Sequence, residues 1–262
     1  MKPSLIYMYN INKKQIIISL LSFIFVVAVA FVSLGNYIKQ ESGEVRQTII
    51  VSFVILVYIT FLAMIVIQAV SAFGKMTEST LFRLTSISGK KIVLAILLYA
   101  VIYLLIFELI GSIFLYGISM KIIKGTELYE VLFTQSVFTP LKHLFSTMLY
   151  VFNLSSILLV LLFSVASVKV FSLKKKKLKY PMVFFLFLLV TKLLGTIYGM
   201  LGGLAPAAPL IKKLVYIDDS SGADVFLYPE KLMNLYSLSF SIGIFILLVY
   251  ITGRIIDKKL EV

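Results

Sequence analysis

Few residues in this chain could carry covalent or metal chemistry. It has one histidine, His143, and no cysteine. Without cysteine there is no disulfide, thiolate nucleophile or iron–sulfur site, and one histidine cannot build a multi-histidine metal centre. A zinc protease needs two histidines one helical turn apart, and an aspartyl protease needs paired aspartates, whereas the apolar stretches here contain none. The composition therefore excludes most classes of membrane enzyme.

The nearest match to a phosphate-binding loop is Gly89-Lys90, which resembles the end of a P-loop. Lys91 follows where Ser or Thr should stand, and the upstream glycine is missing. We therefore expect that this chain is not an enzyme, and that it needs no cofactor of its own.

Two ionisable residues, Glu108 and Lys192, lie inside apolar stretches. A charge is costly in lipid, so both side chains should face protein or water. At about 1.5 Å per residue, Glu108 lies roughly 24 Å and Lys192 roughly 17 Å from the starts of their stretches. Two long side chains can bridge this difference, and we predict an ion pair. It is either a clamp that fixes helix packing or a polar element of a translocation path or gate.

The elements that position these residues are six apolar stretches, each long enough for a helix across a bilayer. They cover residues 16–37, 48–73, 92–119, 145–170, 181–203 and 233–256. Six spans leave no room for a soluble domain. We predict an all-α polytopic membrane protein that forms one transmembrane domain over residues 1–262.

Charge sets the predicted orientation. With the N-terminus inside, the cytoplasmic segments carry sixteen Lys and Arg and three acidic residues, and the external segments carry eight of each. The positive-inside rule then predicts that both termini are cytoplasmic. The chain's +13 charge could also suggest nucleic acid, but it lies in short loops that suit anionic lipid headgroups better. We expect no nucleic-acid partner.

Two loops are informative. The cytoplasmic loop at 71–91 has a helix-start signal, Thr77 followed by Glu78, and then the apolar residues Leu81, Phe82 and Leu84. It predicts a short helix that is either an interfacial connector or a docking site for a cytosolic partner.

The external segment 204–232 follows a glycine-rich stretch and begins with two prolines, which break a helix. It is either a re-entrant cap over an exit or an ordinary loop with interfacial helices.

The six spans, the short basic N-terminal segment and the 71–91 loop together resemble the permease subunits of ABC-2 type exporters. The loop matches the family pattern at Glu78, Leu81, Phe82 and Leu84, and again from Thr85 through Gly89 to Ile92. Ser86 stands where many members have proline. The resemblance implies an ABC-2 exporter fold and a coupling helix that seats in a groove of an ATPase subunit. The ATPase contacts would be Glu78, Leu81, Phe82, Arg83 and Leu84.

The resemblance also implies partners. Two cytosolic ABC ATPase subunits would bind ATP and Mg²⁺, and a second permease copy or a homologue would complete the path. Small permeases of this kind resemble exporters of antimicrobial and amphipathic peptides, including phenol-soluble-modulin and lantibiotic exporters. The expected location is a bacterial plasma membrane. Two other classes stay open: an ion-coupled secondary transporter, and a membrane immunity or sensor protein that moves no substrate.

Overall fold

Six long helices make up the computed structural model, which describes residues 2–37, 43–78, 87–118, 140–170, 176–202, 216–217, 225–226 and 235–260. The helices are α1 (Lys2–Tyr37), α2 (Gly43–Glu78), α4 (Gly89–Ile118), α6 (Pro140–Val170), α7 (Lys176–Gly202) and α8 (Leu235–Leu260). All six are long and apolar enough to cross a membrane. The prediction of six spans is therefore confirmed, and the chain is a multi-pass membrane protein.

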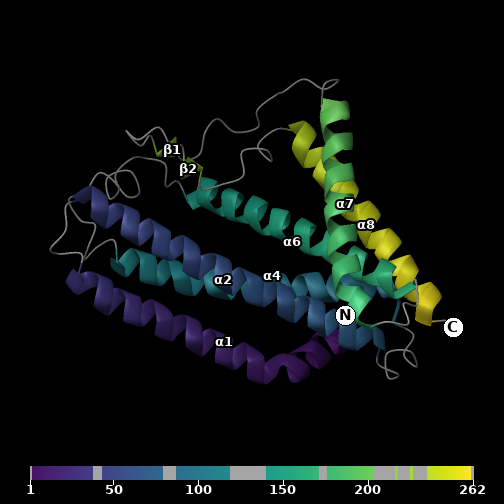
Figure 1. Ribbon diagram of the computed structural model, residues 1–262, viewed down its shortest axis with the longest axis horizontal. Coiled ribbons are helices and arrows are strands. Elements are labelled where there is room, and N and C mark those ends of the chain that lie inside the picture. Colours follow the sequence, from purple (N-terminus) through teal and green to yellow (C-terminus); the bar gives the residue numbers. More distant parts are fainter. Residues whose placement is uncertain are drawn as a thin grey trace.

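Helix α4 lies at the centre of the bundle. It packs against α1 and α2 on one side and against α6 and α8 on the other, and α7 packs mainly on α6. In Figure 1 α1, α2, α4 and α6 run lengthwise, whereas α7 and α8 stand more steeply at one end. Helix α7 is the outermost, since none of its most apolar stretch is buried within the bundle.

An aromatic core joins α1, α2 and α4. The ring of Phe23 lies edge-on to Phe61, at 4.7 Å between centroids, and to Phe107, at 4.8 Å. Tyr103 packs on Phe107 one turn away, at 5.1 Å. Edge-to-face aromatic contacts of this kind add to the packing that holds helices together where lipid supplies no hydrophobic driving force between them.

The outer faces of the helices carry large apolar side chains such as Phe25, Phe185 and Ile246, each about two-thirds exposed. In water such a surface would aggregate, but lipid is as apolar as these side chains. Helical structure suits the same setting, because a helix pairs its backbone polar groups within itself.

Two short strands depart from the all-helical prediction. β1 (Tyr216–Ile217) and β2 (Val225–Phe226) pair antiparallel in the segment 204–232, which the charge pattern predicts to be external. Interfacial or re-entrant helices were expected in this segment, but its described residues form a strand pair instead. The rest of the segment lies outside the described residues. In Figure 1 both termini lie at one end of the bundle, and β1 and β2 lie toward the other.

Candidate functional site

The candidate site lies at the end of the bundle where α2 ends, α4 begins, and α6 and α8 bring their last turns. We call it the basic end, and its described parts are residues 74–78, 87–91, 169–170 and 250–258. Residues 74–78 and 87–91 lie within the 71–91 loop that the sequence singled out, near its start and its end. Each side of the loop is held by a different helix.

Lys169 of α6 holds the last turn of α2. Its Nζ donates to the Gly74 carbonyl at 3.1 Å and to Thr77 Oγ1 at 2.6 Å, and it lies 3.1 Å from Glu78 Oε1. The C-terminal end of a helix carries partial negative charge, which favours a nearby cation. The ammonium group of Lys169 therefore stabilises the last turn of α2 and ties it to α6.

Thr77 does not start a helix, so the helix-start signal was wrong at this position. Its hydroxyl donates to the carbonyls of Phe73, at 2.8 Å, and Gly74, at 3.0 Å, inside the last turn of α2. A threonine hydroxyl can bond backward to the preceding turn as readily as it can cap the next one. Glu78 is the last residue of α2 and is 69% exposed.

The other four residues expected to contact an ATPase, Leu81, Phe82, Arg83 and Leu84, lie outside the described residues. Their role stays a prediction.

Asp257 of α8 holds the first turn of α4. Its Oδ1 accepts a hydrogen bond from the Gly89 amide at 2.5 Å. The Ser88 carbonyl accepts from Lys91 N at 2.9 Å and from Ile92 N at 3.2 Å, which marks the start of the helix. The first amides of a helix lack partners within it, and a carboxylate suits their positive end. Asp257 thus caps α4 from a different helix.

Two glycines let α4 and α8 meet backbone to backbone. A Cβ built on Gly89 would lie 2.3 Å from the Gly253 carbonyl oxygen, and one on Gly253 would lie 2.5 Å from Lys90 Cγ and 2.7 Å from Lys90 N. No methyl group fits at such distances. In the sequence Gly89 stood out only as the end of an incomplete P-loop and as part of the loop motif, and Gly253 carried no signal.

Two cations flank the ring of Tyr250 on α8. Lys90 Nζ lies 4.1 Å from the ring centroid, and the guanidinium carbon of Arg254 lies 5.8 Å from it. Both distances are within the range of a cation–π interaction. Lys90 and Arg254 are both exposed at the surface of the basic end.

The contacts at the basic end hold the ends of neighbouring helices together. No group of three or more metal-ligating side chains gathers within the described ranges. Two contacts fix the ends of the connection 79–88. Lys169 of α6 binds the end of α2, which precedes the connection, and Asp257 of α8 binds the start of α4, which follows it. Helices α6 and α8 also pack on each other.

Glu108 and Lys192 are not brought together. Glu108 of α4 accepts a hydrogen bond from Tyr58 of α2 at 2.9 Å. Lys192 lies exposed on α7 and makes no ion pair in the part of the chain that the structure describes. The two residues lie on helices that are not neighbours at this point, because α7 packs on α6 and α8 and not on the side of α4 that carries Glu108. The predicted ion pair is therefore not formed within this chain.

A buried polar cluster lies between α1, α2 and α4, and the buried Gln68 is its member on α2, next to Tyr103 of α4. The hydroxyls of Ser19 and Tyr103 are bonded to each other, and Tyr103 also donates to the Ile16 carbonyl at 3.2 Å. Asn12 is fully buried next to Tyr99, and within the described ranges its side chain makes no well-formed hydrogen bond. Buried polar groups of this kind usually hold ordered water. Sequence reasoning missed this cluster because its members are scattered over three helices.

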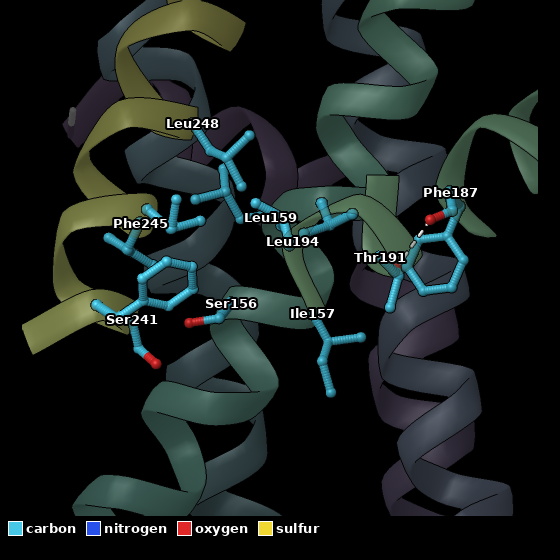
Figure 2. A pocket seen from close by; sticks show the side chains of 12 residues that line it. Ser156, Ile157, Leu159, Phe187, Thr191, Leu194, Ser241, Phe245 and Leu248 are labelled. Carbon is cyan, nitrogen blue, oxygen red and sulfur yellow. Dashed lines mark hydrogen bonds between the residues drawn. The ribbon is translucent and has the colours of Figure 1, made fainter. Parts of the chain in front are cut away.

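An apolar cavity of about 310 Å³ lies between α6, α7 and α8. Figure 2 shows Ile157 and Leu159 of α6, Leu194 of α7 and Leu248 of α8 around it. The hydroxyl of Thr191 donates to the Phe187 carbonyl of its own helix at 2.8 Å, so its hydrogen is not available to a ligand. The cavity can accept an apolar group and offers little polar recognition.

No family model, curated protein or solved structure matches this chain.

Proposed function

We propose that the chain is the transmembrane permease subunit of an ABC exporter with the ABC-2 type fold. Two cytosolic ATPase subunits would bind ATP and Mg²⁺ and bind the 71–91 loop. A second copy of the chain, or a homologue, would complete the translocation path. The substrate class that we favour is an amphipathic peptide or another hydrophobic molecule, exported across a bacterial plasma membrane.

One observation carries this proposal: the 71–91 loop is held on both sides. Lys169 ties the end of α2 to α6, and the contact of Gly89 with Gly253 and Asp257 ties the start of α4 to α8. A flexible connector needs no such contacts. A segment that must pass movement from a cytosolic motor into the spans does need them, because a loosely attached loop would move without moving the helices.

The excess of positive charge supports the orientation that this function requires. Lys75, Lys90, Lys169 and Arg254 all lie at the basic end, which the positive-inside rule assigns to the cytoplasm. The apolar cavity between α6, α7 and α8 is consistent with a hydrophobic substrate, although it is smaller than a peptide helix.

A second candidate is an ion-coupled secondary transporter, and the contact between Glu108 and Tyr58 favours it. Glu108 is a carboxyl group inside a span with a hydroxyl donor at 2.9 Å, an arrangement that can take up and release a proton. The two functions differ in what Glu108→Gln does. A proton-coupled transporter loses transport in this variant, whereas an ATP-driven exporter keeps it.

The test is purification of the tagged chain from its native membrane in mild detergent, with mass spectrometry of the co-eluting proteins and an ATPase assay. The exporter proposal expects a near-stoichiometric ATP-binding subunit and ATPase activity. A chain that purifies alone, without ATPase activity, would favour secondary transport or an immunity or sensor role instead.

A further inference from the structure

A second apolar hollow, a groove of about 640 Å³, lies between α4, α6 and α8. Its walls include Leu94, Leu98 and Leu105 of α4, Met148 and Phe152 of α6, and Phe245 of α8. Leu98 is 39% exposed and Met148 is 63% exposed, so the groove opens sideways toward the lipid. From Leu94 to Leu105 it runs roughly 16 Å along α4, at 1.5 Å per residue.

Lys90 lies on the same face of α4 as this groove. Residues 90, 94, 98, 101 and 105 follow the three- and four-residue spacing that places side chains on one face of a helix. Lys90 therefore stands one turn from Leu94, at the end of the groove nearest the basic end. Arg254 of α8 lies near the same ring as Lys90, since both cations flank Tyr250, although neither Tyr250 nor Arg254 lines the groove itself.

The two cations have no carboxylate partner in the part of the chain that the structure describes. The nearest acid in sequence, Asp257, directs its Oδ1 to the Gly89 amide. Two exposed positive charges therefore lie beside the end of the groove that is nearest the basic end. An apolar channel with cations beside its end at the membrane surface is complementary to an amphiphile with an anionic head.

We propose that this groove binds an anionic phospholipid, with one acyl chain along Leu94–Leu105 and the phosphate between Lys90 and Arg254. A lipid fits better than a peptide, because the polar recognition lies at one end and the long wall offers almost none. The bound lipid would brace the junction of α4 and α8 beside Gly89 and Gly253. The proposal does not depend on an ATPase partner.

The test uses the delipidated full chain in detergent, with native mass spectrometry to count bound lipids. Dioleoyl phosphatidylglycerol and dioleoyl phosphatidylcholine are added separately, and inorganic phosphate is added in a competition arm. One phosphatidylglycerol should bind in preference to phosphatidylcholine, and millimolar phosphate should not displace it. Displacement by phosphate, or equal binding of both lipids, would overturn the proposal.

Matched variants locate the site. Lys90→Gln with Arg254→Gln should weaken phosphatidylglycerol binding by about tenfold or more, since each basic residue near a surface contributes severalfold to the attraction. Lys91→Gln with Lys258→Gln removes the same charge from exposed positions of the same two helices and should leave binding within about twofold. Equal losses in the two pairs would show general electrostatic attraction and overturn the site.

A further pair tests the acyl-chain groove without any change of charge. Leu98→Trp fills the groove and should weaken binding, whereas Leu109→Trp, at an exposed position of α4 that does not line it, should not. Size-exclusion profiles like that of the unmodified chain establish that each variant is folded. Unchanged binding in folded Leu98→Trp would contradict the proposed position of the chain.

Discussion

Gly89 and Gly253, from the start of α4 and the last turns of α8, approach so closely that a methyl group on Gly89 would lie 2.3 Å from the Gly253 carbonyl oxygen. The close approach also brings Asp257 to the Gly89 amide and Lys90 to Tyr250. The junction of these two helices thus fixes one side of the 71–91 loop. The contacts of Lys169 fix the other.

Alanine at either glycine should destabilise the protein. Gly89→Ala and Gly253→Ala each force the backbones of α4 and α8 apart, and overpacking of this kind costs about 1–3 kcal/mol. Thermal unfolding in detergent should show a midpoint lowered by several degrees. Gly243→Ala is the matched control, because no atom lies within 4 Å of a Cβ built there. Equal midpoints for Gly253→Ala and Gly243→Ala would show that the contact is not tight.

Asp257 should contribute to stability through its cap of α4. Asp257→Ala leaves the Gly89 amide without its acceptor and should cost about 1–2 kcal/mol. Asp257→Asn keeps an acceptor oxygen but loses the charge, so it should cost about half as much. The same unfolding assay measures both. If neither Asp257→Ala nor Asp257→Asn lowers the stability, the carboxylate does not cap the helix.

Lys169 should stabilise the end of α2 mainly through Thr77 and the Gly74 carbonyl, and less through Glu78. Lys169→Met should cost about 1–2 kcal/mol and speed amide hydrogen exchange over residues 74–78. Glu78→Gln should cost about 0.5 kcal/mol or less, because exposed ion pairs contribute little. A double-mutant cycle of Lys169→Met with Thr77→Val should show coupling. A larger effect from Glu78→Gln than from Thr77→Val would reverse this ranking.

The absence of cysteine makes the orientation simple to measure. Lys258→Cys, at the basic end, and Ser221→Cys, in the external segment, each introduce a unique thiol. The positive-inside rule predicts that a membrane-impermeant maleimide labels Ser221→Cys in intact cells and labels Lys258→Cys only after permeabilisation. The opposite pattern would invert the assignment of the two faces.

The number and positions of the spans could be predicted because apolar length is set by the thickness of the bilayer. The ends of the helices could not be predicted as well. α1 begins at Lys2 and α2 continues to Glu78, beyond the apolar runs at 16–37 and 48–73, because a helix can continue into the surface layer where charged side chains are tolerated. The length of an apolar run therefore predicts the part of the helix that lies in the hydrocarbon core, and not the full length of the helix.

The lateral arrangement was not accessible from the sequence. Depth along each helix placed Glu108 and Lys192 at similar levels, but depth does not say which helices are neighbours, and the structure gives Glu108 a partner on α2 instead. The contact between Gly89 and Gly253 could not be predicted either, because the sequence does not show that α4 and α8 are neighbours. A weak signal did exist, since Asp257 is an acidic residue among the basic residues Arg254, Lys258 and Lys259, where a specific partner is expected.

The most direct test of the exporter account compares the unmodified chain with Phe82→Asp/Leu84→Asp after purification from the native membrane. The account predicts that an ATP-binding subunit and ATPase activity co-purify with the unmodified chain. Both should be lost from the double variant, although its membrane insertion and yield are unchanged. A double variant that keeps its ATPase would contradict the coupling role of the 71–91 loop, and an unmodified chain that purifies alone would contradict the exporter function itself.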